Sequence, residues 1–214
     1  MKKILGLAIA AILVMATVGF GTWSYFTDTE TSNNNQITAG TLDLKINNGD
    51  TNYTILDPTV DVTLANKAPG DTGSAFAPLK NAGTLPGLFS ITSGSITNTF
   101  ATVGSSEFAD GVGNLSADSQ IAPWIDVNAN SSFDTGDLAL KSDGTVVPFA
   151  TGLQWGTWAA FASKTWNPVI ASMAKNAIVN FYINWRIDTT DTNVNEIQGD
   201  GVKLSFSFYL DQIH

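Results

Sequence analysis

The chain has 214 residues, of which 43% are hydrophobic and 14% charged, and its formal net charge is −9. This composition is typical of a folded domain and excludes a disordered chain. The negative charge argues against binding to nucleic acid or anionic lipid and favours cations as partners. Because the chain has no cysteine, disulfide bonds cannot staple it, and its core or a bound metal must hold the fold.

The N-terminal segment has the features of a secretory signal peptide. Lys2 and Lys3 precede an uncharged apolar run at residues 4–18, and small residues stand at the −3 and −1 positions before Tyr25. We therefore expect residues 1–24 to be cleaved, which removes two lysines and changes the formal charge from −9 to −11. A retained anchor helix is the alternative, because the residues after the run could extend it towards the roughly 20 residues that a bilayer needs.

The residues after the predicted cleavage site form a polar arm. Residues 25–40 are crowded with Thr, Asn and acidic side chains and contain few apolar ones. Such a segment has too little apolar surface to fold alone, so we expect a loose arm.

Four segments alternate apolar and polar residues with a period of two, which is typical of strands with one buried face. They are residues 41–46, 60–64, 179–187 and 202–210. Turn-forming Gly, Asn, Asp and Pro residues separate them. The pattern predicts an all-β fold, an antiparallel β-sandwich resembling a jelly roll, over residues 41–214.

Helix is expected to be minor. The segment 157–166, "TWAAFASKTW", is predicted to be helical, with Thr157 as its N-cap and Asn167-Pro168 as its end. Residues 104–143 show little periodicity and are interpreted as a long excursion between strands.

A calcium-like loop lies within this excursion, "DVNANSSFDTGD". Oxygen-bearing side chains at positions 1, 3, 5, 9 and 12, with the carbonyl of position 7, have the spacing by which a twelve-residue loop binds Ca²⁺. The candidate ligands are Asp126, Asn128, Asn130, Ser132, Asp134 and Asp137.

Two positions of this loop depart from the usual pattern. Position 6 is Ser131 in place of glycine, and position 12 is the shorter Asp, as in loops of the dockerin type. Bound Ca²⁺ would have a structural role. The alternative is an Asn/Asp-rich turn held by hydrogen bonds of its own side chains.

Three Asn residues lie in N-x-S/T sequons and are candidate glycosylation sites: Asn52, Asn114 and Asn130. Asn130 is also a candidate calcium ligand, so it cannot serve both purposes.

Most of the catalytic-residue arrangements that hydrolases use are not possible in this chain. Its single histidine is His214 and it has no cysteine, so Ser-His-Asp, Cys-His and H-E-x-x-H arrangements are excluded. A pair of catalytic carboxylates is left open, because spatial pairing is invisible in a sequence. The acids considered are Asp57, Asp61, Asp188 and Asp191.

The chain resembles the TasA/camelysin family of exported filament and matrix proteins. Residues 21–46, "GTWSYFTDTETSNNNQITAGTLDLKI", are similar to the family's signal-peptide end, G-T-aromatic-x-x-F-x-D, followed by A/S-G-T-L-D-L. Residues 67–91, "KAPGDTGSAFAPLKNAGTLPGLFSI", resemble its P-G-D turn and N-x-G-x-L strand, and residues 199–213 resemble its closing strand. Residues 93–161 lie outside these motifs, so the resemblance implies an insertion at about 93–161 in the β-sandwich domain.

The resemblance implies a secreted jelly-roll protein that assembles into fibres at the cell surface. The N-terminal arm of one subunit would add a strand to the sheet of the next. Its partners would be copies of itself and other matrix or surface proteins, with the membrane contacted only through the signal peptide. The donated residues are expected to be Tyr25, Phe26, Thr27, Asp28, Thr29 and Glu30. Some family members are described as metalloproteases, but this sequence offers no histidine cluster for zinc, so we expect no enzyme.

A second hypothesis is a calcium-stabilised binding module of the cell surface for sugars. Its platform would be the tryptophans Trp155, Trp158 and Trp166. The competing interpretation, which we favour, places these large side chains in the core or in helix packing.

Overall fold

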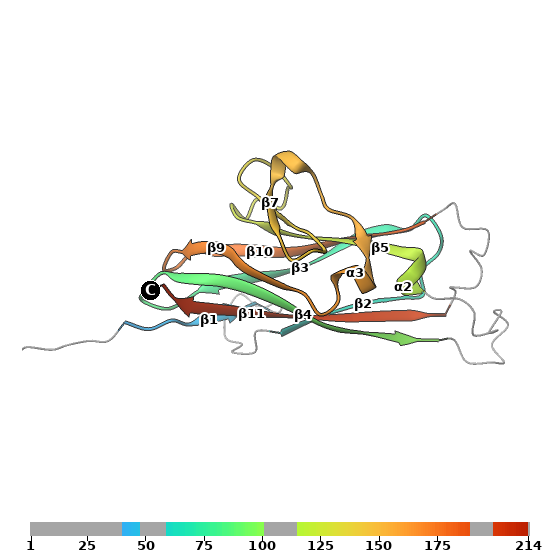
Figure 1. Cartoon of the computed structure of the whole chain (residues 1–214), viewed down its shortest axis with the longest axis horizontal. Helices are drawn as coiled ribbons and strands as arrows, with labels where there is room; N and C mark the ends of the chain where they lie inside the picture. Colours follow the sequence, from blue (N-terminus) through green and yellow to red (C-terminus); the bar gives the residue numbers. More distant parts are fainter. Residues whose placement is uncertain (1–39, 48–58, 101–114, 189–198, 214) are drawn as a thin grey trace, which may run out of the picture. The chain divides into compact units, whose positions relative to one another are not determined.

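Two antiparallel sheets form the part of the chain that the computed structural model describes, residues 40–47, 59–100, 115–188 and 199–213. These residues belong to one unit, Gly40–His214. The predicted all-β sandwich is confirmed. Figure 1 shows the strands in two layers, with the segment that carries β7 projecting from one of them.

The larger sheet, sheet A, has seven strands in the order β1-β3-β10-β5-β6-β7, with β8 pairing with β5. Their bounds are β1 Leu44–Ile46, β3 Thr72–Asn81, β5 Ser119–Asp126, β6 Leu138–Leu140, β7 Val146–Pro148, β8 Gly156–Thr157 and β10 Ile178–Ile187.

The smaller sheet, sheet B, has four strands in the order β2-β11-β4-β9. Their bounds are β2 Thr59–Ala65, β4 Gly87–Thr99, β9 Thr165–Met173 and β11 Gly201–Gln212. The helical elements are short: α2 Leu115–Asp118, the 3-10 helix η1 Phe149–Thr151 and α3 Trp158–Phe161.

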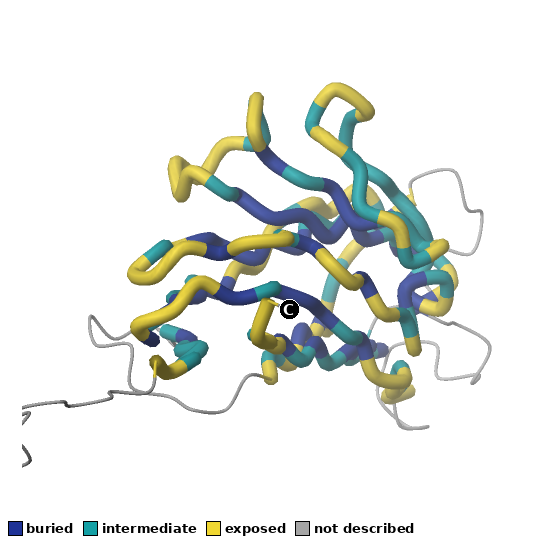
Figure 2. The backbone as a smooth tube through the Cα atoms, turned by 60° about the vertical axis from the view of Figure 1, so that its left-hand side comes forward, coloured by how far each residue is buried: buried dark blue, intermediate teal, exposed yellow. Residues whose placement is uncertain are grey.

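The core lies between the two sheets and is built from the alternating residues that the sequence singles out. Phe181 of β10 contacts Phe206 and Phe208 of β11 across the sandwich, with ring centroids 4.9 and 5.1 Å apart. All three rings are buried. Figure 2 shows the buried segments as dark blue stretches inside the strands and the exposed ones as yellow loops and ends. Burial of such rings is the main driving force of the fold.

The predicted strands agree with the structure at β2, β10 and β11, whereas the first is shorter than expected. Only Leu44–Ile46 of the segment 41–46 is a strand. The backbone of Thr41 instead accepts hydrogen bonds from the N–H groups of Thr84 and Leu85, at 2.9 and 3.2 Å. This part of the chain therefore lies against the β3–β4 turn and does not pair with a strand.

The interpretation of residues 104–143 as an excursion between strands is wrong for β5, which lies inside sheet A between β10 and β6. Both faces of β5 are covered, and seven of its eight residues are buried, so it has no alternating pattern to detect. Pro123 lies between the residues that pair with β8 and those that pair with β6. Its missing N–H therefore falls outside both ladders.

The predicted helix over 157–166 is wrong in its second half. Thr157 is the N-cap, and its hydroxyl accepts the N–H of Ala160 at 3.3 Å, but α3 ends at Phe161. Ser163 then has a φ of +54°, which turns the chain into strand β9. The Asn167–Pro168 bond is cis and lies within this strand. The large residues of this segment have helical spacing in the sequence, but they belong to a short helix followed by a strand.

Candidate functional site

The twelve-residue loop between β5 and β6 is closed by a network of its own side chains. Asn128 Nδ2 donates to Asp134 Oδ1 at 3.0 Å, and Asn130 Nδ2 donates to Asp134 Oδ2 at 2.7 Å. The side chains of these three candidate ligands are therefore together. The N–H of Ser132 donates to Asn130 Oδ1 at 2.8 Å, which fixes the orientation of that amide.

The two ends of the loop are buried carboxylates that bind backbone N–H groups. Asp126 accepts the N–H of Asn130 at 3.1 Å and that of Ser131 at 2.8 Å. Asp137 accepts the N–H of Val127 and that of Asp134, both at 2.9 Å. Asp137 therefore joins the Asn128–Asp134 cluster through the backbone N–H of Asp134.

Position 6 of the loop has the backbone that a calcium loop requires there, although its residue is not glycine. Ser131 has a φ of +67°, in the left-handed region that glycine normally occupies in such loops. The carboxylate of Asp126 binds its N–H and stabilises this conformation. Position 6 therefore differs from the usual calcium-loop pattern in its residue type but not in its backbone conformation.

The described residues contain no group of three or more His, Cys, Asp or Glu side chains placed to hold a metal ion. Ca²⁺ binding at this loop would therefore depend on the amide oxygens of Asn128 and Asn130 and on a backbone carbonyl, in addition to carboxylates. Of the sequons, Asn130 lies in this loop and is exposed, whereas Asn52 and Asn114 lie outside the described residues.

The expected signal peptide, residues 1–24, lies outside the described residues, as do the arm residues 25–39. In the described part of the chain no helix is long and apolar enough to cross a membrane. The acids Asp57 and Asp191 also lie outside it.

Strand β2 provides a regular sheet edge. It pairs with β11 in an unbroken register from Thr59↔Ser207 to Ala65↔Gly201, and no other described strand pairs with it. At the other edge of sheet B, β9 pairs with β4 through two register shifts and contains Pro168. Bulges and proline make an edge a poor template for a further strand, so β2 is the better one.

The outward face of β2 carries one ion pair. Lys203 Nζ lies 2.5 Å from Asp61 Oδ2, and Ser205 donates to Asp61 Oδ1 at 2.6 Å. Hydrogen bonds from Lys203 and then Ser205 lower the pKa of Asp61 below its usual value. This carboxylate is therefore engaged within sheet B by Lys203 and Ser205.

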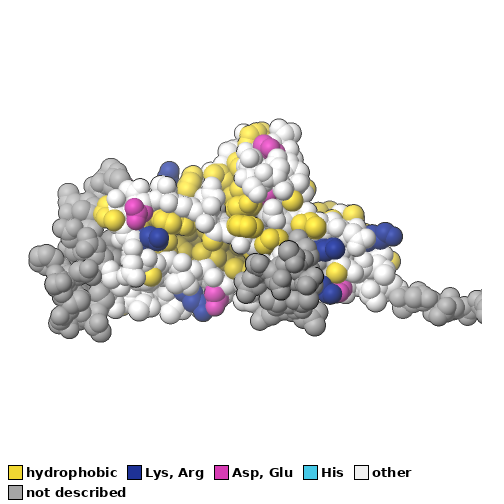
Figure 3. Space-filling view, turned by 180° about the vertical axis from the view of Figure 1, so that it is seen from behind, with side chains coloured by type: hydrophobic (Ala, Val, Ile, Leu, Met, Phe, Trp, Pro, Cys, Tyr) yellow, Lys and Arg dark blue, Asp and Glu magenta, His cyan; other side chains and the backbone are white. Residues whose placement is uncertain are grey.

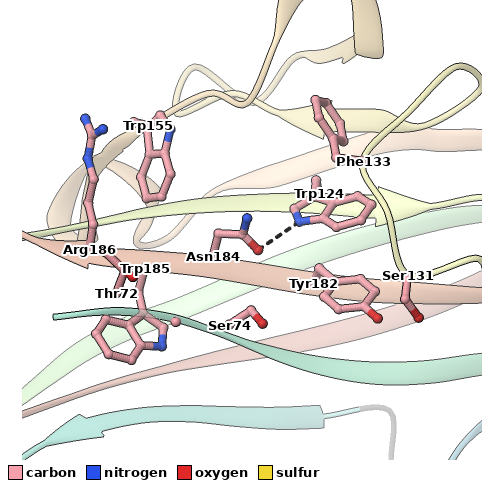
Figure 4. A pocket seen from close by; sticks show the side chains of 11 residues that line it. Thr72, Ser74, Trp124, Ser131, Phe133, Trp155, Tyr182, Asn184, Trp185 and Arg186 are labelled. Carbon is pink, nitrogen blue, oxygen red and sulfur yellow. Dashed lines mark hydrogen bonds between the residues drawn. The ribbon is translucent and has the colours of Figure 1, made fainter.

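Aromatic side chains gather on the outer face of sheet A. A hollow of about 440 Å³ lies there and is lined mainly by aromatic and small polar side chains (Figure 4). Figure 3 shows hydrophobic side chains, in yellow, across the middle of one face of the molecule.

The predicted sugar platform of three tryptophans is wrong for two of them. Trp158 and Trp166 are fully buried and belong to the core. Their indole N–H groups donate to Ser119 Oγ and to the Lys141 carbonyl, both at 2.8 Å. Trp155 is half-buried and lines the hollow on sheet A. The favoured core interpretation thus holds for Trp158 and Trp166.

Sequence reasoning missed the other residues of this surface, among them Trp124 and Tyr182. The signal was present for Tyr182, because it stands on the polar face of the alternating segment 179–187. An aromatic residue at such a position indicates a covered or binding face.

The family comparison concerns the N-terminal part of the chain. The family described as camelysin metallo-endopeptidase matches residues 1–96, a range that includes β1, β2, β3 and most of β4. Residues 1–96, a little under half of the chain, are similar to this family. This match confirms the resemblance inferred from the sequence motifs. The camelysin family is a group of secreted or cell-surface proteins. The comparison with curated proteins gave no match.

The camelysin name refers to a metallo-endopeptidase, an activity that requires a catalytic metal site. Catalytic zinc sites take three protein ligands, with His common among them. Here the single histidine, His214, lies outside the described residues. The residues that the structure describes do not fit a catalytic zinc site.

The camelysin N-x-G-x-L motif has a clear structural role. Asn81 is fully buried, and its Nδ2 donates to the carbonyls of Leu85 and Met173 at 2.9 and 3.1 Å. Its Oδ1 accepts the N–H of Gly83 at 3.0 Å. A Cβ at Gly83 would lie 2.3 Å from the Thr41 carbonyl oxygen, so only glycine fits. The motif therefore joins the β3–β4 turn to the start of the domain.

Proposed function

We propose that the protein is a secreted structural subunit that polymerises into an extracellular filament, pilus or biofilm matrix fibre. Each subunit donates residues from about Tyr25 to Asn35 as a strand to the sheet of the next subunit. The role is structural and not catalytic. The camelysin match over residues 1–96, which includes this arm, supports a surface protein of this kind.

The outer edge of β2, with which no other described strand pairs, is the observation that carries the proposal. This edge is seven residues long and regular. A row of backbone N–H and C=O groups at such an edge binds an added strand through main-chain hydrogen bonds. Because donor and acceptor are different surfaces, the contact is heterologous and continues into a filament without closing.

The composition of the arm suits addition to an edge and does not suit independent folding. Its residues Tyr25, Phe26, Thr27 and Thr29 favour extended backbone. In a strand, Asp28 and Glu30 face the same side, because alternate residues share a face. We place both on the solvent side, where a carboxylate keeps its hydration.

Electron microscopy tests this proposal with three versions of the protein. The first begins at Tyr25, the second begins at Gln36, and the third begins at Tyr25 with residues 25–35 in scrambled order. We expect filaments from the first and monomers from the second. The scrambled arm keeps composition and charge but loses the strand pattern, so it should assemble poorly. Filaments of equal number from all three versions would contradict the proposal.

We also propose that Ca²⁺ stabilises the loop between β5 and β6. In this proposal the ion takes the place of the hydrogen bonds among Asn128, Asn130 and Asp134, and Asp126, Ser132 and Asp137 complete its ligands. Thermal unfolding with Ca²⁺ and with a chelator tests it. Ca²⁺ should raise the unfolding temperature of the wild type but not that of Asp134→Ala. An equal unfolding temperature of the wild type under both conditions would contradict it.

A further inference from the structure

A row of stacked aromatic rings crosses three strands on the outer face of sheet A. Tyr182 of β10 is in register with Phe76 of β3 and with Trp124 of β5. The centroid of its ring lies 5.2 Å from that of Phe76 and 4.6 Å from that of Trp124, and both pairs are stacked. Tyr182 and Trp124 are nearly buried, whereas Phe76 is 60% exposed.

The row continues into the segment that projects over the sheet. Phe133 of the β5–β6 loop packs edge-on against Trp124, and Phe149 of η1 packs edge-on against Phe133, with centroids 5.1 and 5.0 Å apart. These contacts fix one wall of the hollow of about 440 Å³. The wall is therefore preformed, which lowers the entropic cost of binding.

Trp155 lies on the other side of the hollow. The guanidinium of Arg186 lies 4.3 Å from the centre of the Trp155 ring. Arg186 is itself held by Gln120, because its Nε and Nη2 donate to Gln120 Oε1 at 2.9 and 2.6 Å. Figure 4 shows the Trp155 ring between Arg186 on one side and the space leading to Phe133 and Trp124 on the other. One face of the indole thus binds the cation, and the other borders the hollow.

Polar groups line the floor between these walls. Asn184 Oδ1 accepts the indole N–H of Trp124 at 3.2 Å, which orients the amide in the hollow. The hydroxyl groups of Ser74 and Ser131 also line it. A second hollow of about 260 Å³ is lined by Gln120, Arg186, Ile187 and Asp188. Arg186 lines both, so the two hollows adjoin and give room for more than one ring-sized unit.

We propose that this groove binds an extended acidic saccharide, a chain of sugar rings that carry carboxylates. A pyranose ring presents C–H groups on its faces and hydroxyls at its rim. It therefore matches an indole face flanked by amide and hydroxyl side chains. Arg186 is the one charged residue among those that line the larger hollow. In a protein of net charge −9, this places a cation where the saccharide carboxylate would bind.

The same lining disfavours two other occupants. A lipid chain would leave the amide of Asn184 and the serine hydroxyls without partners. A donated strand needs unpaired backbone groups, and the floor strands β3, β10 and β5 already pair with one another. The inference therefore does not rest on the proposed filament assembly.

Isothermal titration of the full chain with two probes tests the inference. The probes are tetragalacturonate, which is acidic, and cellotetraose, which is neutral. We expect the wild type to bind tetragalacturonate more tightly than cellotetraose. Trp155→Ala should weaken binding of both by about tenfold, because a stacking contact is lost. Arg186→Gln should weaken binding of tetragalacturonate by about tenfold and leave cellotetraose nearly unchanged.

Two variants separate binding from folding. Trp155→Phe keeps an aromatic face and should retain most of the affinity. Tyr209→Ala removes an exposed ring from β11, on the other sheet, and should bind like the wild type. Binding of neither probe by the wild type would overturn the proposal. So would full affinity in Trp155→Ala, or an equal loss in Tyr209→Ala. Loss of filaments in Trp155→Ala without loss of saccharide binding would instead assign the groove to contacts between subunits.

Discussion

At the scale of single residues, buried polar side chains determine where the chain turns. Asn81 satisfies two carbonyls and one N–H group that would otherwise be buried without partners. It thereby joins the β3–β4 turn to Met173 at the end of β9. Such a residue contributes more to stability through the hydrogen bonds that it gives to backbone groups than through the burial of its own side chain.

We predict that Asn81→Ala lowers the free energy of unfolding by about 2–3 kcal/mol, because its partners lose their hydrogen bonds in a buried site. Asn81→Asp is the matched variant, since it keeps an acceptor for Gly83 but loses both donors. It should be destabilised as well. Urea unfolding measures both variants. A cost below about 0.5 kcal/mol for Asn81→Ala, the range of ordinary surface substitutions, would contradict this role.

The Asp61 carboxylate should contribute to stability in a pH-dependent way. Its pKa is lowered in the folded protein by hydrogen bonds from Lys203 and Ser205. A lowered pKa gives a contribution that is present above the unfolded pKa of about 3.9 and is lost as the pH falls through the folded pKa. We predict that Asp61→Asn costs a few tenths of a kcal/mol at pH 7, because the pair is exposed. The difference should vanish in acid, and a cost that persists there would refute the assignment.

At the scale of elements, the alternation of apolar and polar residues predicted the strands that have one solvent-exposed face. It failed for strands that are buried on both faces. Segments 179–187 and 202–210 alternate cleanly and appear as β10 and β11. Strand β5 does not alternate, because the aromatic row and the projecting segment cover its outer face. A sequence pattern reports burial on one face only, so a strand buried on both faces has no signal of this kind.

The calcium-like loop illustrates a different limit. The spacing of its oxygen side chains predicted calcium ligands, and in the structure Asn128, Asn130 and Asp134 lie together through hydrogen bonds between their side chains. Spacing alone could not place Asp137, whose carboxylate binds the N–H groups of Val127 and Asp134. Those hydrogen bonds depend on where strand β6 begins, and the tertiary structure determines that position. The hollow on sheet A was likewise beyond prediction, because its residues come from five separate segments.

One of the residues with positive φ in this loop gives a test of its backbone conformation. Ser131 has a φ of +67°, a conformation that costs a side-chain-bearing residue roughly 1 kcal/mol. We predict that Ser131→Gly is as stable as the wild type or more so. Its neighbour Ser132 is not among the residues of positive φ, so Ser132→Gly should cost about 0.5–1 kcal/mol. Thermal unfolding compares the two, and the opposite order would contradict the loop conformation.

At the scale of the whole molecule, net charge controls how readily copies approach each other. Like-charged subunits repel, and the Debye length falls from about 30 Å at 0.01 M salt to about 8 Å at 0.15 M. With a formal charge of −9 on the full chain, we predict that assembly is faster at 0.15 M than at 0.01 M sodium chloride. Light scattering follows the rate. A rate that falls as salt rises would mean that opposite charges, and not main-chain pairing, drive assembly.

The measurement that tests the account most directly is a disulfide between the arm of one subunit and β2 of another. The chain has no cysteine, so introduced thiols report only on the chosen pair. Subunits with Thr27→Cys or Asp28→Cys, one for each face of the arm, are mixed with subunits carrying cysteine at Thr59, Thr63 or Ala65. Lys45→Cys on β1 and Ala171→Cys on β9 are the controls, since they probe two of the other edges.

A disulfide forms when the Cα atoms lie about 4.4–6.8 Å apart. Strand donation to β2 therefore predicts crosslinked pairs for at least one β2 position and for neither control. Absence of crosslinks at every β2 position, or equal crosslinking at β9, would contradict the account.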